Sequence, residues 1–171
     1  MATMLCFILS DVRIDADELR EAVSSSVETT FNRISVDGDT STNDMVLVMA
    51  NGLTGNGALS SGDYERFQKG LVLVMDELAT MIVRDGEGAT KLISLKIKGA
   101  ATDMDALAAA RAIANSSLVK TAFYGQDPNW GRIMAVLGRS GIRMREDDVS
   151  IWVDDVKIVV GGLGNGPDSE T

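Results

Sequence analysis

The chain has 171 residues, of which 45% are hydrophobic and 24% charged, with a formal net charge of -9 and a pI near 4.4. This length and composition are typical of one globular domain with a sizeable buried core. The acidic balance disfavours a nucleic-acid partner because it repels phosphate groups, and no apolar run approaches the roughly 20 residues that span a bilayer.

The counts of histidine and cysteine limit the possible chemistry. The chain has no histidine and one cysteine, so by itself it supplies neither a Ser-His-Asp nor a Cys-His catalytic arrangement. It also lacks a disulfide framework and a cysteine-based metal site. We therefore expect no metal and no cofactor, a reducing intracellular compartment, and an amine or a carboxylate as the base of any covalent catalyst.

The chain opens with a short apolar run, residues 4–9, that predicts a buried strand. Thr3 stands at the mouth of this run. Its hydroxyl becomes a candidate nucleophile if cleavage frees its own α-amino group, whose pKa of about 7.7–8 suits a base near neutral pH. The alternative is an ordinary polar residue at the end of a strand. For Cys6 within the run we expect a buried hydrophobic role.

Alternating helices and strands follow. A capping-box pattern at Asp15 and Glu18 and an apolar stripe predict a helix over about 15–33. Residues 35–44 form a dense polar loop whose spacing does not fit a calcium loop, although it suits a polar wall beside a site. A strand over 45–49, a glycine-rich loop and a helix over about 63–83 come next. Within that helix, Met75 and Met81 are expected to fill the core.

Glu87 lies between two glycines in the turn that follows this helix. The glycines allow a tight turn that projects one carboxylate, either as a solvated turn residue or as a group that binds a cationic substrate. The glycine-to-lysine spacing is too short for a phosphate-binding loop. A strand is expected over 92–97.

The second half of the chain predicts a helix over 103–116, a strand over 119–124, and a helix that begins near Asn129 and ends near Leu137. A hairpin over 150–160 turns at Asp154 and Asp155, and residues 161–171 are expected to be a flexible tail. No repeat or linker divides the chain. We therefore predict a single α/β domain over 1–171 with a mixed β-sheet and packed helices.

Four stretches taken together resemble the β chain of ornithine acetyltransferase, the glutamate N-acetyltransferase family of arginine biosynthesis. These stretches are Met1–Leu5, Ser35–Asp44, Asp85–Lys91 and Asp127–Ile133. The resemblance implies an N-terminal-nucleophile type of fold and a cytoplasmic enzyme.

The same resemblance implies that a precursor cuts itself between Ala2 and Thr3. The new N-terminal Thr3 then takes an acetyl group from N-acetylornithine and passes it to glutamate in a ping-pong cycle, with its own α-amine as base. Glu87 matches the family's glycine-flanked glutamate and is expected to contact the amino-acid substrate. Some family members also use acetyl-CoA.

Two features depart from the family pattern. Met1 and Ala2 precede Thr3, whose nitrogen is then an amide that cannot act as a base. The chain also stops before the family's last segment, which supplies an Asn and a Ser or Thr to the substrate. Oxyanion-hole donors and a substrate-binding lysine come from the family's α chain. We therefore expect this chain to be inactive without an α partner, in an assembly of two α and two β chains.

Two alternatives remain open from the sequence. A free N-terminal threonine would equally serve an N-terminal-nucleophile amidohydrolase or aminopeptidase that releases the acyl group to water. An acidic binding or assembly domain that never frees Thr3 is the non-enzymatic alternative.

Overall fold

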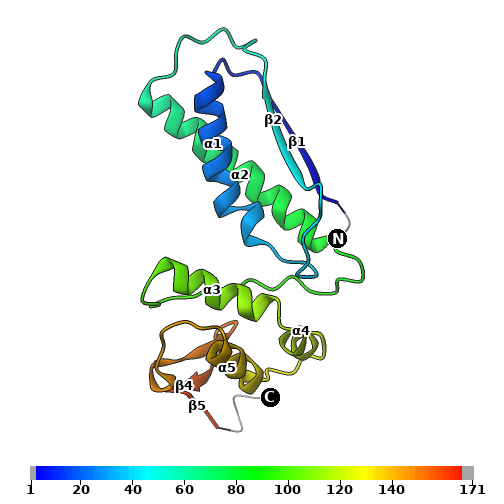
Figure 1. Cartoon of the computed structure of the whole chain (residues 1–171), viewed down its shortest axis with the longest axis vertical. Helices are drawn as coiled ribbons and strands as arrows, with labels where there is room; N and C mark the ends of the chain where they lie inside the picture. The colour runs from blue at the N-terminus through cyan, green and yellow to red at the C-terminus, as the bar shows by residue number, and fades with distance from the viewer. Residues whose placement is uncertain (1–2, 167–171) are drawn as a thin grey trace. The chain divides into compact units, whose positions relative to one another are not determined.

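The structure is a computed structural model of the chain that describes residues 3–166 (Figure 1). It contains helices with both parallel and antiparallel strand pairing, which confirms the α/β class. The contacts gather into two compact units, Met1–Ala89 and Thr90–Thr171. One domain over the whole chain therefore stays a prediction.

The first unit contains a two-stranded parallel sheet and two long helices. Strands β1 (Leu5–Ser10) and β2 (Met45–Ala50) pair in register, with Leu5 opposite Met45 and Ser10 opposite Ala50. Helix α1 (Ala16–Thr29) follows β1, and helix α2 (Ser61–Arg84) follows β2. The chain thus runs strand, helix, strand, helix, as expected.

Side-chain caps begin both helices of this unit. The Asp15 carboxylate accepts a hydrogen bond from Asp17 N–H, and the Ser60 hydroxyl accepts one from Asp63 N–H. Each cap satisfies a backbone donor that the first helical turn leaves without a partner. The helix expected over 15–33 ends at Thr29, and a 3₁₀ turn, η1 (Phe31–Arg33), completes the segment.

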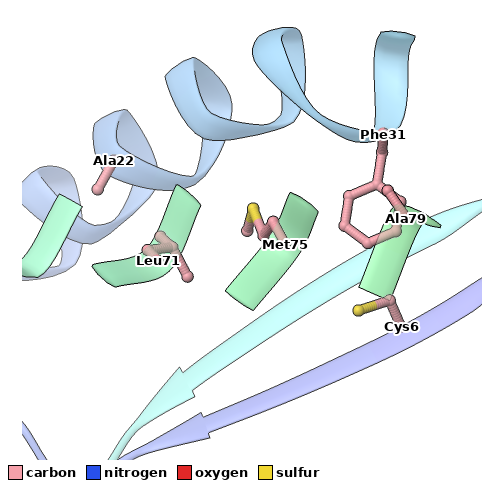
Figure 2. Packing of buried hydrophobic residues seen from close by; sticks show 6 residues of the cluster. All are labelled: Cys6, Ala22, Phe31, Leu71, Met75 and Ala79. Carbon is pink, nitrogen blue, oxygen red and sulfur yellow. The ribbon is translucent and has the colours of Figure 1, made fainter. Parts of the chain in front are cut away.

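One face of the sheet packs on the helices through a continuous apolar core. Figure 2 shows Met75 of α2 between α1 and the strands, with Cys6 of β1 on the sheet side. Met75 is fully buried, and the six buried members of the core are Cys6, Ala22, Phe31, Leu71, Met75 and Ala79. The core roles predicted for Cys6 and Met75 are confirmed. The one predicted for Met81 is wrong, since its side chain is 52% exposed.

The second unit has three short helices and a three-stranded antiparallel sheet. The helices are α3 (Asp103–Ala114), α4 (Ser117–Tyr124) and α5 (Trp130–Arg139), and a 3₁₀ turn, η2 (Glu146–Asp148), follows them. The strands are β3 (Ile151–Val153), β4 (Val156–Val160) and β5 (Leu163–Gly164), in that order. The hairpin predicted at Asp154 is confirmed, with Asp154 at a positive φ of 51°.

Three expectations for this unit are wrong. Residues 119–124 form most of helix α4 instead of a strand, because the Ser116 hydroxyl caps the helix and Val119 and Ala122 bury one helical face. Residues 92–97 have no ladder partner among residues 3–166, so they form no β-strand there. Leu163–Gly164 pair with β4 rather than opening a flexible tail. Residues 167–171 lie outside the described part.

Candidate active site

The polar loop before β2 reaches the candidate nucleophile. The parallel register sets Leu5 opposite Met45, and Thr3 and Asn43 each precede their strand by two residues. The Thr3 hydroxyl donates a hydrogen bond of 2.8 Å to Asn43 Oδ1. Strand pairing therefore brings together a hydroxyl and an amide oxygen that are 40 residues apart in sequence.

Further hydrogen bonds hold this loop against the start of β1. Met4 N–H donates to Asp44 Oδ1 at 2.9 Å, and Met45 N–H donates to the Met4 carbonyl at 2.8 Å. The Ser41 hydroxyl donates to Asn43 Oδ1 at 2.8 Å. Asn43 Oδ1 thus accepts hydrogen bonds from two hydroxyl groups, those of Thr3 and Ser41, and these bonds orient the amide toward Thr3.

The sequence alone singled out the loop as a polar wall but assigned no individual roles to Ser41, Asn43 and Asp44. A usable signal was present, since both apolar runs begin immediately after polar residues. Aligning the first residues of the two runs, Met4 and Met45, places Thr3 beside Asp44, one residue from the Asn43 that it contacts in the structure. The sequence did not reveal that the two strands pair directly, or that Leu5 rather than Met4 lies opposite Met45.

The glycine-flanked turn at Glu87 lies in the same unit as Thr3. Helix α2 ends at Arg84, and Ala89 N–H donates to the Gly86 carbonyl at 2.9 Å to close the turn. Gly88 has a φ of +70°, a conformation that favours glycine. The Glu87 side chain is exposed, so the turn projects its carboxylate as the spacing predicted.

The polar loop also meets this turn. A Cβ added to Gly86 would lie 3.2 Å from Val36 Cγ1, closer than ordinary van der Waals contact, so only a glycine fits there without a shift of its neighbour. Figure 1 shows the start of β1 and the end of α2 at the same end of this unit. The 35–44 loop therefore contacts both predicted site elements, Thr3 through Asn43 and the Glu87 turn through Val36.

The Asp127–Ile133 segment has a role within the second unit. Asn129 caps α5 by accepting from Arg132 N–H, and its amide nitrogen donates to Asp127 Oδ2 at 3.0 Å. Arg132 Nη1 donates to the Leu118 carbonyl at 2.8 Å and to Thr121 Oγ1 at 3.0 Å. The segment thus joins α5 to α4.

A cleft of about 300 Å³ lies elsewhere in the first unit, at the beginning of α2. It is lined by Glu18, Glu21, Leu59, Ser60, Ser61 and Tyr64. Since a helix rises about 1.5 Å per residue, the 24 residues of α2 place the cleft roughly 35 Å from the Glu87 end. The cleft is therefore separate from the candidate site.

No helix within residues 3–166 is long and apolar enough to cross a membrane. Within the same residues, histidine, cysteine, aspartate and glutamate side chains form no group of three or more that could hold a metal ion.

Comparison with known proteins agrees with the four stretches. The chain is 52% identical over 172 residues to the arginine biosynthesis bifunctional protein ArgJ of Desulfotalea psychrophila, covering 99% of this chain and 44% of that protein. It is 51% identical over 166 residues to the glutamate N-acetyltransferase of Methanocaldococcus jannaschii, covering 95% of this chain and 41% of that protein. It therefore spans less than half the length of these relatives.

The fold agrees with a solved structure of the same kind. The crystal structure of arginine biosynthesis bifunctional protein ArgJ from Bacillus halodurans superposes with a TM-score of 0.91 at 45% identity, covering 97% of this chain and 79% of that one. The ArgJ family model matches residues 1–171. The chain therefore belongs to the ArgJ family.

Proposed function

We propose that this chain is the catalytic β portion of an acetyltransferase that moves an acetyl group from N-acetylornithine to glutamate in arginine biosynthesis. The observation that carries the proposal is the Thr3 hydroxyl held by Asn43 at the mouth of β1, in a chain that matches the ArgJ family from end to end. The printed names of its relatives, which include a glutamate N-acetyltransferase, support the reaction class.

The proposed chemistry begins with cleavage of the Ala2–Thr3 bond, of which Ala2 lies outside the described residues. Cleavage frees the Thr3 α-amine, which takes the hydroxyl proton as Oγ1 attacks the acetyl carbonyl of N-acetylornithine. The C–N bond breaks, the proton passes to the departing ornithine amine, and an acetyl-threonine ester remains. Glutamate's amine then attacks that ester, and Thr3 recovers its proton.

Glu87 is proposed to bind the ammonium group of the amino-acid substrate. An exposed carboxylate on a tight turn can form a charge-assisted hydrogen bond to such a group, and the bond strengthens when a bound partner excludes water. The contact of the 35–44 loop with both the turn and Thr3 supports a shared site. Glu87→Gln should therefore raise KM more than it lowers kcat, while Glu77→Gln on exposed α2 surface serves as the matched control.

An α partner from the same precursor is proposed to cover the open face of the β1–β2 sheet. Six large apolar side chains on this face are between 37% and 74% exposed: Leu5, Phe7, Leu9, Met45, Leu47 and Met49. Exposed apolar patches of this kind mark interaction surfaces. The chain spans 44% of the Desulfotalea relative, which leaves a large portion able to cover the face.

The oxyanion-hole donors are proposed to come from this α portion, in an assembly of two α and two β chains. Since loss of one such donor commonly lowers the rate by about 10²–10³, the chain alone should be inactive. We further propose a cytoplasmic location, with which the buried lone Cys6 thiol is compatible, and acetyl-CoA as a second acetyl donor.

The test is acetyl transfer by the full-length precursor. N-terminal sequencing should find a chain that begins at Thr3, and acetylglutamate should form from N-acetylornithine when glutamate is present. Thr3→Ala should abolish both cleavage and turnover. Thr29→Ala, which removes an exposed hydroxyl at the end of α1, should leave both intact.

The same assay separates the alternatives. Equal release of free acetate with and without glutamate would establish a hydrolase instead of a transferase. Turnover retained in Thr3→Ala would contradict the assignment of the nucleophile.

A further inference from the structure

The segment Leu92–Lys98 has the side-chain pattern of a half-buried strand. Ile93, Leu95 and Ile97 alternate with Ser94, Lys96 and Lys98. Leu95 and Ile97 are partly buried against the core of the second unit, whose buried members are Ala109, Ile113, Val119, Val136 and Leu137. Lys96 and Lys98 are exposed. The period of two therefore separates an inner face from an outer face over residues 95–98, while Ile93 at the start of the pattern is 42% exposed.

The backbone of this segment lacks the pairing that such a pattern requires. Among residues 3–166, no hydrogen bond joins an N–H or C=O group of 92–98 to another residue, and the segment belongs to neither sheet. Backbone groups of a strand are normally paired, and an unpaired strand edge is a template for another strand. Seven residues is also an ordinary strand length.

We propose that Leu92–Lys98 pairs with an added β-strand supplied by the part of the longer ArgJ protein that this chain lacks. More than half the length of the Desulfotalea relative lies outside the match. The inference rests on the proposed function only in taking the added strand from the same precursor.

Charge and pattern define the added strand. The inner side chains of the added strand must be apolar, because they extend the layer formed by Leu95 and Ile97. Its outer side chains must be acidic, because they lie across from Lys96 and Lys98 and opposite charges on neighbouring strands stabilise a sheet. A second copy of the same segment fits less well. It would place all the Lys96 and Lys98 side chains on one outer face, where like charges repel.

Hydrogen–deuterium exchange read by mass spectrometry tests the pairing without any substrate, so its outcome does not depend on the acetyl-transfer chemistry. In the 171-residue chain alone, amides of 92–98 should exchange rapidly, while those of α3 exchange slowly and show that the unit is folded. In the full-length precursor, the 92–98 amides should exchange at least about a hundredfold more slowly.

Two variants of the precursor locate the pairing. Ile93→Pro and Ser94→Pro each remove an N–H from one of the two opposite edges, because alternate amides point to opposite sides of a strand. At least one of them should remove the protection. Replacing both Lys96 and Lys98 by Glu should lower it at least about tenfold, whereas Lys69→Glu on exposed α2 surface should not.

Four outcomes would overturn the proposal. These are slow exchange of 92–98 in the dilute 171-residue chain, protection that appears in that chain only as its concentration rises, rapid exchange in the full-length precursor, or full protection in both proline variants. The first would identify a partner strand within the chain, and the second would identify another copy. Unchanged protection in the double lysine variant would refute an acidic partner strand.

Discussion

The hydrogen bond between Thr3 and Asn43 leads to a prediction of defined size. In full-length enzyme, Asn43→Ala removes the oxygen that accepts from the Thr3 hydroxyl at 2.8 Å and from the Ser41 hydroxyl at the same distance. A hydrogen bond of this kind contributes about 0.5–1.5 kcal/mol. If the whole of this free energy serves to orient the Thr3 hydroxyl for attack, Asn43→Ala should lower kcat/KM about two- to tenfold.

The effect on stability should be small, because Asn43 is exposed and its backbone N–H still donates to Ser41 Oγ. We expect Asn43→Ala to lower the free energy of unfolding by less than about 0.5 kcal/mol. Asn51→Ala is the matched control. Asn51 follows the far end of β2, where its Oδ1 likewise accepts a hydrogen bond, from Leu53 N–H at 3.0 Å.

Asn43→Asp gives an independent test of the proposed base. It keeps an acceptor oxygen but adds a negative charge near the freed amine of Thr3, and an opposite charge nearby raises the pKa of an ammonium group. The rising limb of the pH–rate profile should therefore move to higher pH. The assay is kcat/KM for acetylglutamate formation across pH. An Asn43→Ala rate equal to that of Asn51→Ala, or an unmoved limb in Asn43→Asp, would refute the argument.

Three further predictions concern stability. Gly162→Ala should destabilise the chain by about 2–4 kcal/mol, because φ is +77° and an added Cβ would lie 2.7 Å from a carbonyl oxygen; a change under 1 kcal/mol in urea titration would contradict this. Met75→Ala should lower the free energy of unfolding by about 2–5 kcal/mol, because it opens a cavity in the core. Met81→Ala, at an exposed site, should lower it by less than about 1 kcal/mol. Equal decreases in the two variants would refute the assigned burial. Hydrogen bonds from the side chain and backbone of Ser60 lower the pKa of Asp63 below 3.8. The ionised Asp63 therefore stabilises the folded chain above pH 3.8, and this stabilisation disappears as the pH falls through the lowered pKa. The urea midpoints of wild type and Asp63→Asn should therefore converge in acid, and a gap that stays constant with pH would exclude this cause.

The helices were largely predictable from the sequence because their signals are local. A helical backbone bonds residues four apart, and its cap lies within three residues of the donor that it satisfies. Ser60 at α2 and Asn129 at α5 show the rule. Helix α4 escaped prediction because Val119 and Phe123 suit a strand equally well, and a short apolar run does not distinguish the two.

The candidate site likewise combines features that follow from the sequence with features that depend on the tertiary structure. The sequence by itself determined that Thr3 precedes an apolar strand, that Glu87 stands between glycines, and that a polar loop precedes the next strand. Only the tertiary structure decided that Thr3 donates to Asn43, that the loop meets the turn at Val36, and that Leu92–Lys98 lacks a partner within residues 3–166. The physical reason is that strand pairing joins residues far apart in sequence, and no local pattern specifies which strand, or which chain, supplies the partner.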